Sequence, residues 1–187
     1  SRTYGGTNPT TGTVTLANGS TLYNGDTLGN ATVASTANAT SNVGNYTLTA
    51  SNQTLSNGSV GNYNITYNNG TLIVNPANLT ITANSASTQY GLGTNLTAVG
   101  YNASGLQNGE TIGSVALTSN GSAVTANAGN YTITAANATN NGNFSTSNYN
   151  ISYNNGTLTV TPANITVIAN NQSRTYGGSN PTTGTVT

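Results

Sequence analysis

The sequence predicts an all-β protein made of small elongated domains in tandem, with a rod or filament architecture. Two observations lead to this prediction. Apolar and polar residues alternate with a period of two in several segments, as in strands with one buried and one solvated face. The same segments return after about 86 residues, which is the signature of a repeat protein. No window shows the i, i+3, i+4, i+7 apolar spacing of an amphipathic helix.

The repeat is marked by Tyr-Gly pairs that begin at Tyr4, Tyr90 and Tyr176, each 86 residues after the last. The run YNITYNNGTLIVNPAN from Tyr63 returns as YNISYNNGTLTVTPAN from Tyr149. The two ends of the chain also match almost completely, so we expect it to be an excerpt of a longer array. The expected units are a repeat lacking its first strand (1–75), a complete repeat (76–161) and the start of a third (162–187).

Within each repeat, strands are expected where the alternation is clearest, at 45–50, 63–67 and 78–83. Two hairpins are predicted, 63–67 with 71–74 and 149–153 with 157–160, because an Asn-Gly pair lies between the strands of each. Asn-Gly suits a type I′ turn, which needs positive φ at both central residues. The segment 105–111 is expected to hold a turn or a short helical turn.

The apolar phase of these strands carries few large side chains, so the core of each repeat is expected to be thin. Tyr63, Tyr67, Tyr149 and Tyr153 fall on that phase and are expected in the core. Small domains are marginally stable, so contacts between neighbouring repeats should contribute much of the stability. Repeats meet in short junctions such as VTPANITV, where Pro162 fixes φ, and consecutive repeats are therefore expected to be stiffly coupled.

The chain has four charged residues, Arg2, Asp26, Glu110 and Arg174, and it has no His and no Cys. It lacks the basic patch that nucleic-acid binding requires, and no apolar run is long enough to span a bilayer. Without imidazole, thiol, Lys or paired carboxylates, we expect no enzyme activity, no metal site and no cofactor. Asp26 and Glu110 are expected to serve a turn, a helix cap or an ion pair with Arg2.

Asn-x-Ser/Thr motifs, the acceptors of N-glycosylation, occur about twice as often as the composition predicts. A solvated strand face of Asn and Thr generates such motifs without any glycosylation, because residues i and i+2 share a face. Against this, aligned repeats keep the motif while changing its letters. The candidate N-glycosylation residues are Asn18, Asn30, Asn38, Asn45, Asn52, Asn57, Asn64, Asn69, Asn78, Asn95, Asn102, Asn120, Asn130, Asn137, Asn143, Asn150, Asn155, Asn164 and Asn171.

The segments ANLTITANSASTQYG, GLQNGET, AGNYTITA and YNISYNNGTLTVTPA resemble the MBG repeats of the YGX type. These repeats occur in very large bacterial surface and secreted proteins, including filamentous-haemagglutinin-like adhesins. The resemblance implies an extracellular stalk-like or fibre-like module with a β-grasp-like fold, for which an Ig-like β-sandwich is the alternative, and it carries no catalytic residues. The sequence differs from the usual composition of the family, because it has almost no charged residues and an excess of Asn.

We therefore expect a structural segment of a bacterial extracellular or cell-surface fibre or stalk, for adhesion, cell-cell contact or biofilm matrix. Its expected partners are neighbouring repeats of the same chain and covalent glycans, with lateral self-association possible; no nucleic acid and no membrane span are expected. One alternative is a carbohydrate-binding or host-ligand-binding adhesin module, in which Tyr4, Tyr90 and Tyr176 form stacking platforms. Another is an amyloid-like polar polymer.

Overall fold

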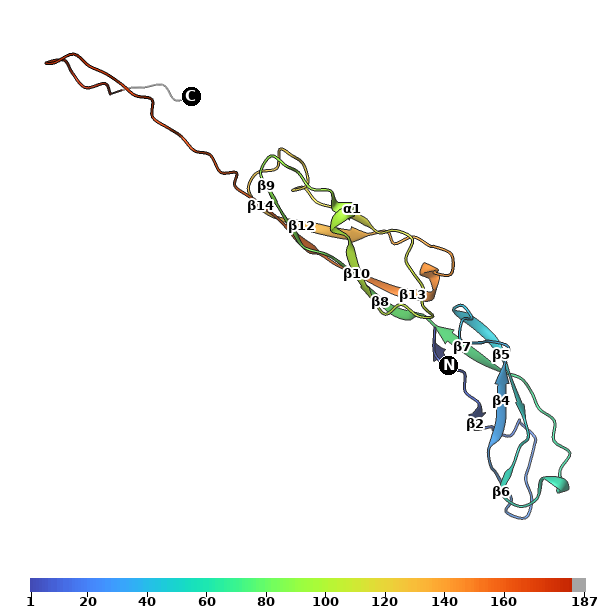
Figure 1. The fold of residues 1–187 in the computed structure, drawn as a ribbon. Helices are drawn as coiled ribbons and strands as arrows, with labels where there is room; N and C mark the ends of the chain where they lie inside the picture. Colours follow the sequence, from blue (N-terminus) through green and yellow to red (C-terminus); the bar gives the residue numbers. More distant parts are fainter. Residues whose placement is uncertain (183–187) are drawn as a thin grey trace.

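The computed structural model describes residues 1–182. Almost all of its regular structure is β, which confirms the predicted fold class. Two small domains lie end to end, and residues 162–168 lead away from the second domain outside any strand (Figure 1). We call residues 1–75 the first repeat and residues 76–161 the second repeat.

The first repeat is built on a five-stranded sheet in the order β1-β7-β5-β4-β2, with a two-stranded sheet of β3 and β6 beside it. Strand β1 runs parallel to β7, and the other pairs are antiparallel. The elements are β1 (Arg2–Thr3), β2 (Thr11–Gly12), β3 (Thr27–Leu28), β4 (Ala31–Ser35), β5 (Gly44–Ser51), β6 (Leu55–Asn57), the 3₁₀ turn η1 (Val60–Asn62) and β7 (Gly70–Asn75).

The second repeat contains two sheets, one in the order β10-β8-β13 and one in the order β11-β12-β14-β9. Strands β13 and β9 are parallel to their neighbours β8 and β14. This mixture of directions differs from an Ig-like sandwich of antiparallel sheets. The elements are β8 (Ala77–Ala83), β9 (Ala86–Gln89), α1 (Leu96–Val99), β10 (Tyr101–Ser104), β11 (Ala116–Thr118), β12 (Gly129–Ala136), the 3₁₀ turn η2 (Thr146–Asn148), β13 (Tyr149–Asn154) and β14 (Gly156–Thr161).

Strand β8 is the centre of the second repeat, and its sequence ANLTITA explains why. Leu79 and Ile81 alternate with polar residues, and both are fully buried. They belong to the same core as Ile133 of β12 and Leu158 of β14. The period-two pattern therefore places one apolar row of β8 against the other sheet, as expected for a strand with one solvated face.

The two predicted hairpins are wrong. Strands β13 and β14 follow one another but do not pair: β13 pairs with β8, and β14 pairs with β12 and β9. The Asn155-Gly156 step carries the chain from one sheet to the other. A Cβ at Gly156 would lie 2.5 Å from the backbone oxygen of Asn84, so glycine is needed there for close approach and not for positive φ.

The positive φ values that a type I′ turn requires occur instead at two other Asn-Gly pairs. Asn24-Gly25 and Asn108-Gly109 have φ values of 57° and 75°, and of 52° and 68°. The residues around each pair are joined by a backbone hydrogen bond, from Asp26 N to Tyr23 O and from Glu110 N to Gln107 O, each 2.9 Å long. The two turns lie in equivalent segments of the repeats, NGDT at 24–27 and NGET at 108–111. The second of them confirms the turn expected within 105–111.

The expected strand at 63–67 is also wrong, although its counterpart in the second repeat, β13, forms. The sheet partner of β13 is β8, and no residue among 1–182 takes the place of β8 in the first repeat. The tyrosines on this phase also differ from one another in burial. Tyr149 is buried as expected, whereas Tyr67 and Tyr153 are 39% and 37% exposed, so the core prediction is wrong for those two.

Candidate functional site at the junction between repeats

The two repeats are joined by one residue. Strand β7 ends at Asn75, β8 begins at Ala77, and Pro76 between them is half-buried. Proline restricts φ and leaves no backbone N–H to satisfy. The apolar core is continuous across this link, since Leu72 and Val74 of β7 belong to the same cluster as Ala77 and Leu79 of β8. The covalent link therefore has little freedom to bend.

A buried carboxylate lies at the centre of the junction. Glu110, at the end of the Gln107–Glu110 turn, is 5% exposed. One carboxylate oxygen accepts a 2.8 Å hydrogen bond from the Tyr149 hydroxyl of the same repeat, and the other accepts a short hydrogen bond from the Tyr4 hydroxyl of the first repeat. Hydrogen bonds to a charged group are stronger than neutral ones. Two tyrosines from different repeats thus converge on one carboxylate.

The aromatic rings around Glu110 are packed against each other. Tyr4 meets Tyr149 edge to face, with ring centroids 5.6 Å apart, and Phe144 stacks on Tyr149 with ring centroids 5.4 Å apart. Such arrangements add to the stabilisation from buried area. Gly5, with φ of 77°, follows Tyr4, and a Cβ there would lie 2.5 Å from the Gln107 side chain. The first Tyr-Gly pair therefore lets the two repeats approach closely.

A second polar contact crosses the junction beside the tyrosines. Asn148, 1% exposed, donates from Nδ2 to Oδ1 of Asn42 at 2.9 Å, and its own Oδ1 accepts from the Val43 N–H at 3.0 Å. An amide that both donates and accepts across an interface fixes the orientation of its two sides. Asn42 is held in turn, because its carbonyl accepts from the Tyr46 hydroxyl.

The tyrosine hydroxyls at the junction stay protonated well into the alkaline range. Burial, together with the hydrogen bond to Glu110, raises the pKa of Tyr4 above its ordinary value of 10.0. Burial raises the pKa of Tyr149 further above that value, and the Glu110 carboxylate contributes in the same direction. Both residues are therefore neutral hydrogen-bond donors to Glu110 near neutral pH.

The first repeat holds its own carboxylate in an equivalent way, but with one tyrosine. Asp26 accepts a 2.8 Å hydrogen bond from the Tyr63 hydroxyl, which itself accepts from the Tyr23 N–H at 3.0 Å. The same pair of bonds joins Tyr149 to Glu110 and to the Gln107 N–H. The expectation that these acids serve a turn is thus realised in both repeats.

Arg2 does not pair with Asp26. Its guanidinium is buried and donates to Oδ1 of Asn8 at 2.7 Å and to the Asn38 carbonyl, which ties the first loop of the repeat to a distant one. In the second repeat Thr88 occupies the equivalent position and donates to the Gly93 carbonyl at 2.8 Å. The two repeats therefore secure this loop with different side chains.

The three Tyr-Gly pairs do not form equivalent surfaces. Tyr4 is buried at the junction, Tyr90 is 47% exposed, and Tyr176 is fully exposed. The sequence identified these residues as one set but did not connect them with the acidic loops. Tyr4 and Glu110 each belong to a motif that recurs at a fixed phase of the repeat, and this common period was the available signal that the two motifs meet.

All the candidate N-glycosylation residues lie within the described part of the chain, and every one is exposed. Among residues 1–182 the one buried asparagine is Asn148, which is not in a motif. Two motif residues have a structural explanation as well, because Asn52 and Asn137 adopt φ of 49° and 53°. Asn tolerates this left-handed conformation better than most residues.

No cluster of three or more potential metal-ligating side chains occurs within residues 1–182. In the same part of the chain, no helix has the length and apolar character needed to cross a membrane.

The fold and the junction define a tandem all-β repeat protein whose neighbouring domains share a core. A family model described as MBG domain (YGX type) matches residues 1–73 and 79–159. The chain therefore belongs to the MBG domain family of the YGX type, whose members are repeat domains found in surface proteins. Neither a curated protein nor a solved structure matches the chain.

Proposed function

We propose that this chain is a load-bearing segment of a bacterial extracellular stalk or fibre that serves adhesion, cell-cell contact or biofilm matrix, and that it has no catalytic role. The observation that carries the proposal is the junction. One proline links the repeats, a continuous core crosses the link, and a carboxylate from one repeat is bound by a tyrosine from the other. A binding module on a flexible linker would need none of these features.

The junction resists bending because bending breaks several contacts together. Separating the repeats would break the hydrogen bond between Tyr4 and Glu110. It would also leave the Asn148 side-chain amide without its hydrogen bond to Asn42. Each buried polar group that loses its partner costs about 1–3 kcal/mol, and more where the group is charged. Together these costs are large enough to keep the two repeats in one relative orientation, and a stalk needs such a fixed orientation.

Dense N-glycosylation is part of this proposal. The motif asparagines are distributed over both repeats and all of them are exposed. The whole chain has only four charged residues. Electrostatic repulsion between copies is therefore too weak to oppose their association. Neutral sugars on the solvated faces would supply solubility and would cover exposed strand edges.

The test uses the protein from its native source. Electron microscopy should show thin filaments with an axial period set by the repeat, and intact-mass measurement should show a hexose-containing ladder above the polypeptide mass. Enzymatic removal of N-glycans is the control, and it should collapse the ladder. A native protein at its polypeptide mass would exclude glycosylation. Compact particles with no axial period would exclude the stalk.

A further inference from the structure

The first and the last strands of the second repeat run side by side in the same direction. Strand β8 pairs in parallel with β13, with Ala77 beside Tyr149. Strand β9 pairs in parallel with β14, with Gln89 beside Thr161. Both pairings join residues that are 72 positions apart, so β8 and β9 together keep one register with β13 and β14 together. We call these four strands the parallel pair.

The parallel pair stays in contact where both of its members change sheet. Strands β8 and β9 belong to different sheets, as do β13 and β14. At this crossover the Thr157 N–H donates a 2.9 Å hydrogen bond to the Ser85 hydroxyl oxygen, again across 72 residues. Gly156 has no Cβ, which would lie 2.7 Å from the backbone oxygen of Ala83. The contact is therefore unbroken over residues 77–89, which is about 40 Å of extended chain.

Side-chain hydrogen bonds reinforce the parallel pair on its solvated face. The hydroxyl oxygens of Thr80 and Ser152 lie 3.1 Å apart. The Thr161 hydroxyl donates to the backbone oxygen of Thr88 at 3.2 Å. The other face is apolar, and Leu158 on that face is fully buried. Hydrogen bonds beside such a buried apolar layer are electrostatically stronger than those in water, so both faces of the pair favour an intact contact.

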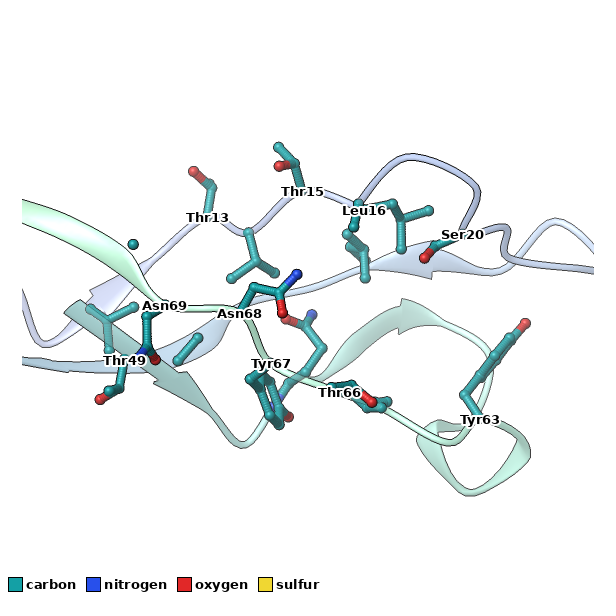
Figure 2. Close-up of a pocket in the computed structure, with 18 of the residues that line it drawn as sticks. Thr13, Thr15, Leu16, Ser20, Thr49, Tyr63, Thr66, Tyr67, Asn68 and Asn69 are labelled. Carbon is teal, nitrogen blue, oxygen red and sulfur yellow. The ribbon is translucent and has the colours of Figure 1, made fainter. Parts of the chain in front are cut away.

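The first repeat shows the same arrangement in part. Arg2 of β1 pairs in parallel with Val74 of β7, also 72 residues away, and the next residue of each strand continues the register. The segment 63–68, which is the counterpart of β13, belongs to no strand and borders an open groove (Figure 2). The register is therefore common to both repeats, and the second repeat contains the longer pair.

Tension along the molecule would reach the parallel pair at its two opposite ends. The chain enters the second repeat at Ala77, directly after the Pro76 link, and leaves it at Thr161. Strands β8 and β13 lie beside the first repeat, whereas β9 and β14 lie toward the opposite end of the second repeat (Figure 1). Stretching the molecule therefore pulls Ala77 and Thr161 apart along the direction of the strands.

This geometry loads the contact between the strands in shear. When two neighbouring parallel strands are pulled from opposite ends, every hydrogen bond between them carries part of the load. The evenly spaced bonds of a parallel ladder must then break together before the strands can separate. When the strands are pulled apart from the same end, the bonds break one after another and less force is needed. The direction of loading thus determines how strongly the repeat resists unfolding.

We infer that the parallel pair is a mechanical clamp, which keeps the second repeat folded under tension along the molecule. The inference rests on the proposed function for the direction of the load, since a stalk is stretched along its axis. It adds a second function to that proposal. The junction fixes the orientation of the two repeats, but it does not prevent either repeat from unfolding. The parallel pair does so, because the strand that receives the load first is bound in register to the strand that passes it on.

Single-molecule stretching of the full 187-residue chain tests the clamp, with handles attached to engineered cysteines because the chain has no native Cys. N78C/T161C places the handles at opposite ends of the parallel pair and loads it in shear. The matched control Q89C/T161C places both handles at the end where β9 and β14 stop. All three residues are exposed. At the same pulling rate, the rupture force of N78C/T161C should be at least about twofold higher, because forced unfolding reports the unfolding barrier and this barrier requires the bonds to break together.

Two double variants, each added to the chain that is loaded in shear, locate the resistance within the repeat. T80V/S152A removes the hydroxyl contact between β8 and β13, and it should lower the rupture force by about a tenth, since one cross-strand hydrogen bond is lost. T118V/T134A changes two exposed, paired residues of β11 and β12, outside the parallel pair, and should leave the force unchanged. Urea unfolding of every variant checks that the second repeat remains folded.

Two results would overturn the inference: equal rupture forces in the two loading directions, or a loss of force for T118V/T134A that equals or exceeds the loss for T80V/S152A. A length gain of about 250 Å, as expected when residues 78–161 unfold together, identifies the event as unfolding of the second repeat. Equal forces would leave the stiff junction and the axial period of native filaments untouched. Native particles without an axial period would exclude the stalk and leave the ratio of the two forces unchanged.

Discussion

The two repeats share nearly the same run of residues, yet one copy of it is a strand and the other is not. YNISYNN in the second repeat forms β13 beside β8, whereas YNITYNN in the first repeat lines an open groove. The sequence difference between the copies is one hydroxyl residue for another, Thr66 and Ser152. The comparison shows that strand formation here depends on the presence of a pairing partner, since local propensity is almost identical.

The comparison extends to the carboxylates. Glu110 receives two tyrosine hydroxyls and is buried, and Asp26 receives one and is half-exposed. Phe144, which stacks on Tyr149, has Gly58 as its counterpart, and a Cβ at Gly58 would lie 2.2 Å from the Asp26 carboxyl. The acidic loop is thus common to both repeats, but its full set of contacts forms only where a neighbouring repeat meets it.

The largest expected difference lies between two residues at equivalent positions of the repeat. Leu79→Ala removes a fully buried side chain and should destabilise the second repeat by about 2–5 kcal/mol. Ile165→Ala, at the equivalent but exposed position 86 residues later, should change the stability of the chain by less than about 0.5 kcal/mol. Urea unfolding of both variants measures this, and equal losses would show that the two segments have the same environment.

The next comparison concerns the tyrosines that bind the carboxylates. Tyr149→Phe removes a donor to the buried Glu110, and a hydrogen bond to a charged group is worth about 1.5–3 kcal/mol. Tyr63→Phe removes the equivalent donor to Asp26, which is more exposed, and should cost clearly less. Denaturant unfolding gives both values. A larger loss for Tyr63→Phe would contradict the assignment of the junction as the more stable site.

The Asn-Gly steps after these tyrosine segments provide a smaller contrast. Gly156→Ala would place a Cβ 2.5 Å from the Asn84 carbonyl oxygen, whereas the atoms nearest to an added Cβ at Gly70 are 3.9 Å away. We expect Gly156→Ala to cost about 1–3 kcal/mol and Gly70→Ala to be close to neutral. Thermal unfolding of the two variants measures the difference. A neutral Gly156→Ala would show that β8 and the start of β14 are not closely packed.

The smallest expected effect is a pH dependence of the junction. The pKa of Tyr4 and of Tyr149 is raised by folding above the ordinary value of 10.0. Their contribution to stability is therefore fully present below pH 10 and is lost as the pH rises above that value, where the unfolded chain releases these protons first. Unfolding experiments across this range should show a steeper alkaline loss for wild type than for Tyr149→Phe. Parallel curves would contradict the prediction.

The sequence predicts the all-β class and the tandem period, because both depend on local alternation and self-similarity. It does not predict how the strands pair. Asn155-Gly156 has the composition of a hairpin turn, yet β13 and β14 belong to different sheets. The contact between Tyr4 and Glu110 joins residues 106 positions apart and depends on the loop geometry that Gly5 and the Gln107–Glu110 turn provide. Contacts between residues so far apart in the sequence produce no local residue pattern from which they could be predicted.

The most direct test of the account is whether the two repeats tumble as one rigid body in solution. Residual dipolar couplings measured for backbone N–H groups of both repeats in the wild-type chain report this. The account predicts that couplings from 1–75 and from 76–161 fit a single alignment tensor, and that Tyr149→Phe and Tyr4→Phe together weaken the agreement. Two distinct tensors in the wild-type chain would show that the repeats move independently, and would contradict the claim of a stiff junction.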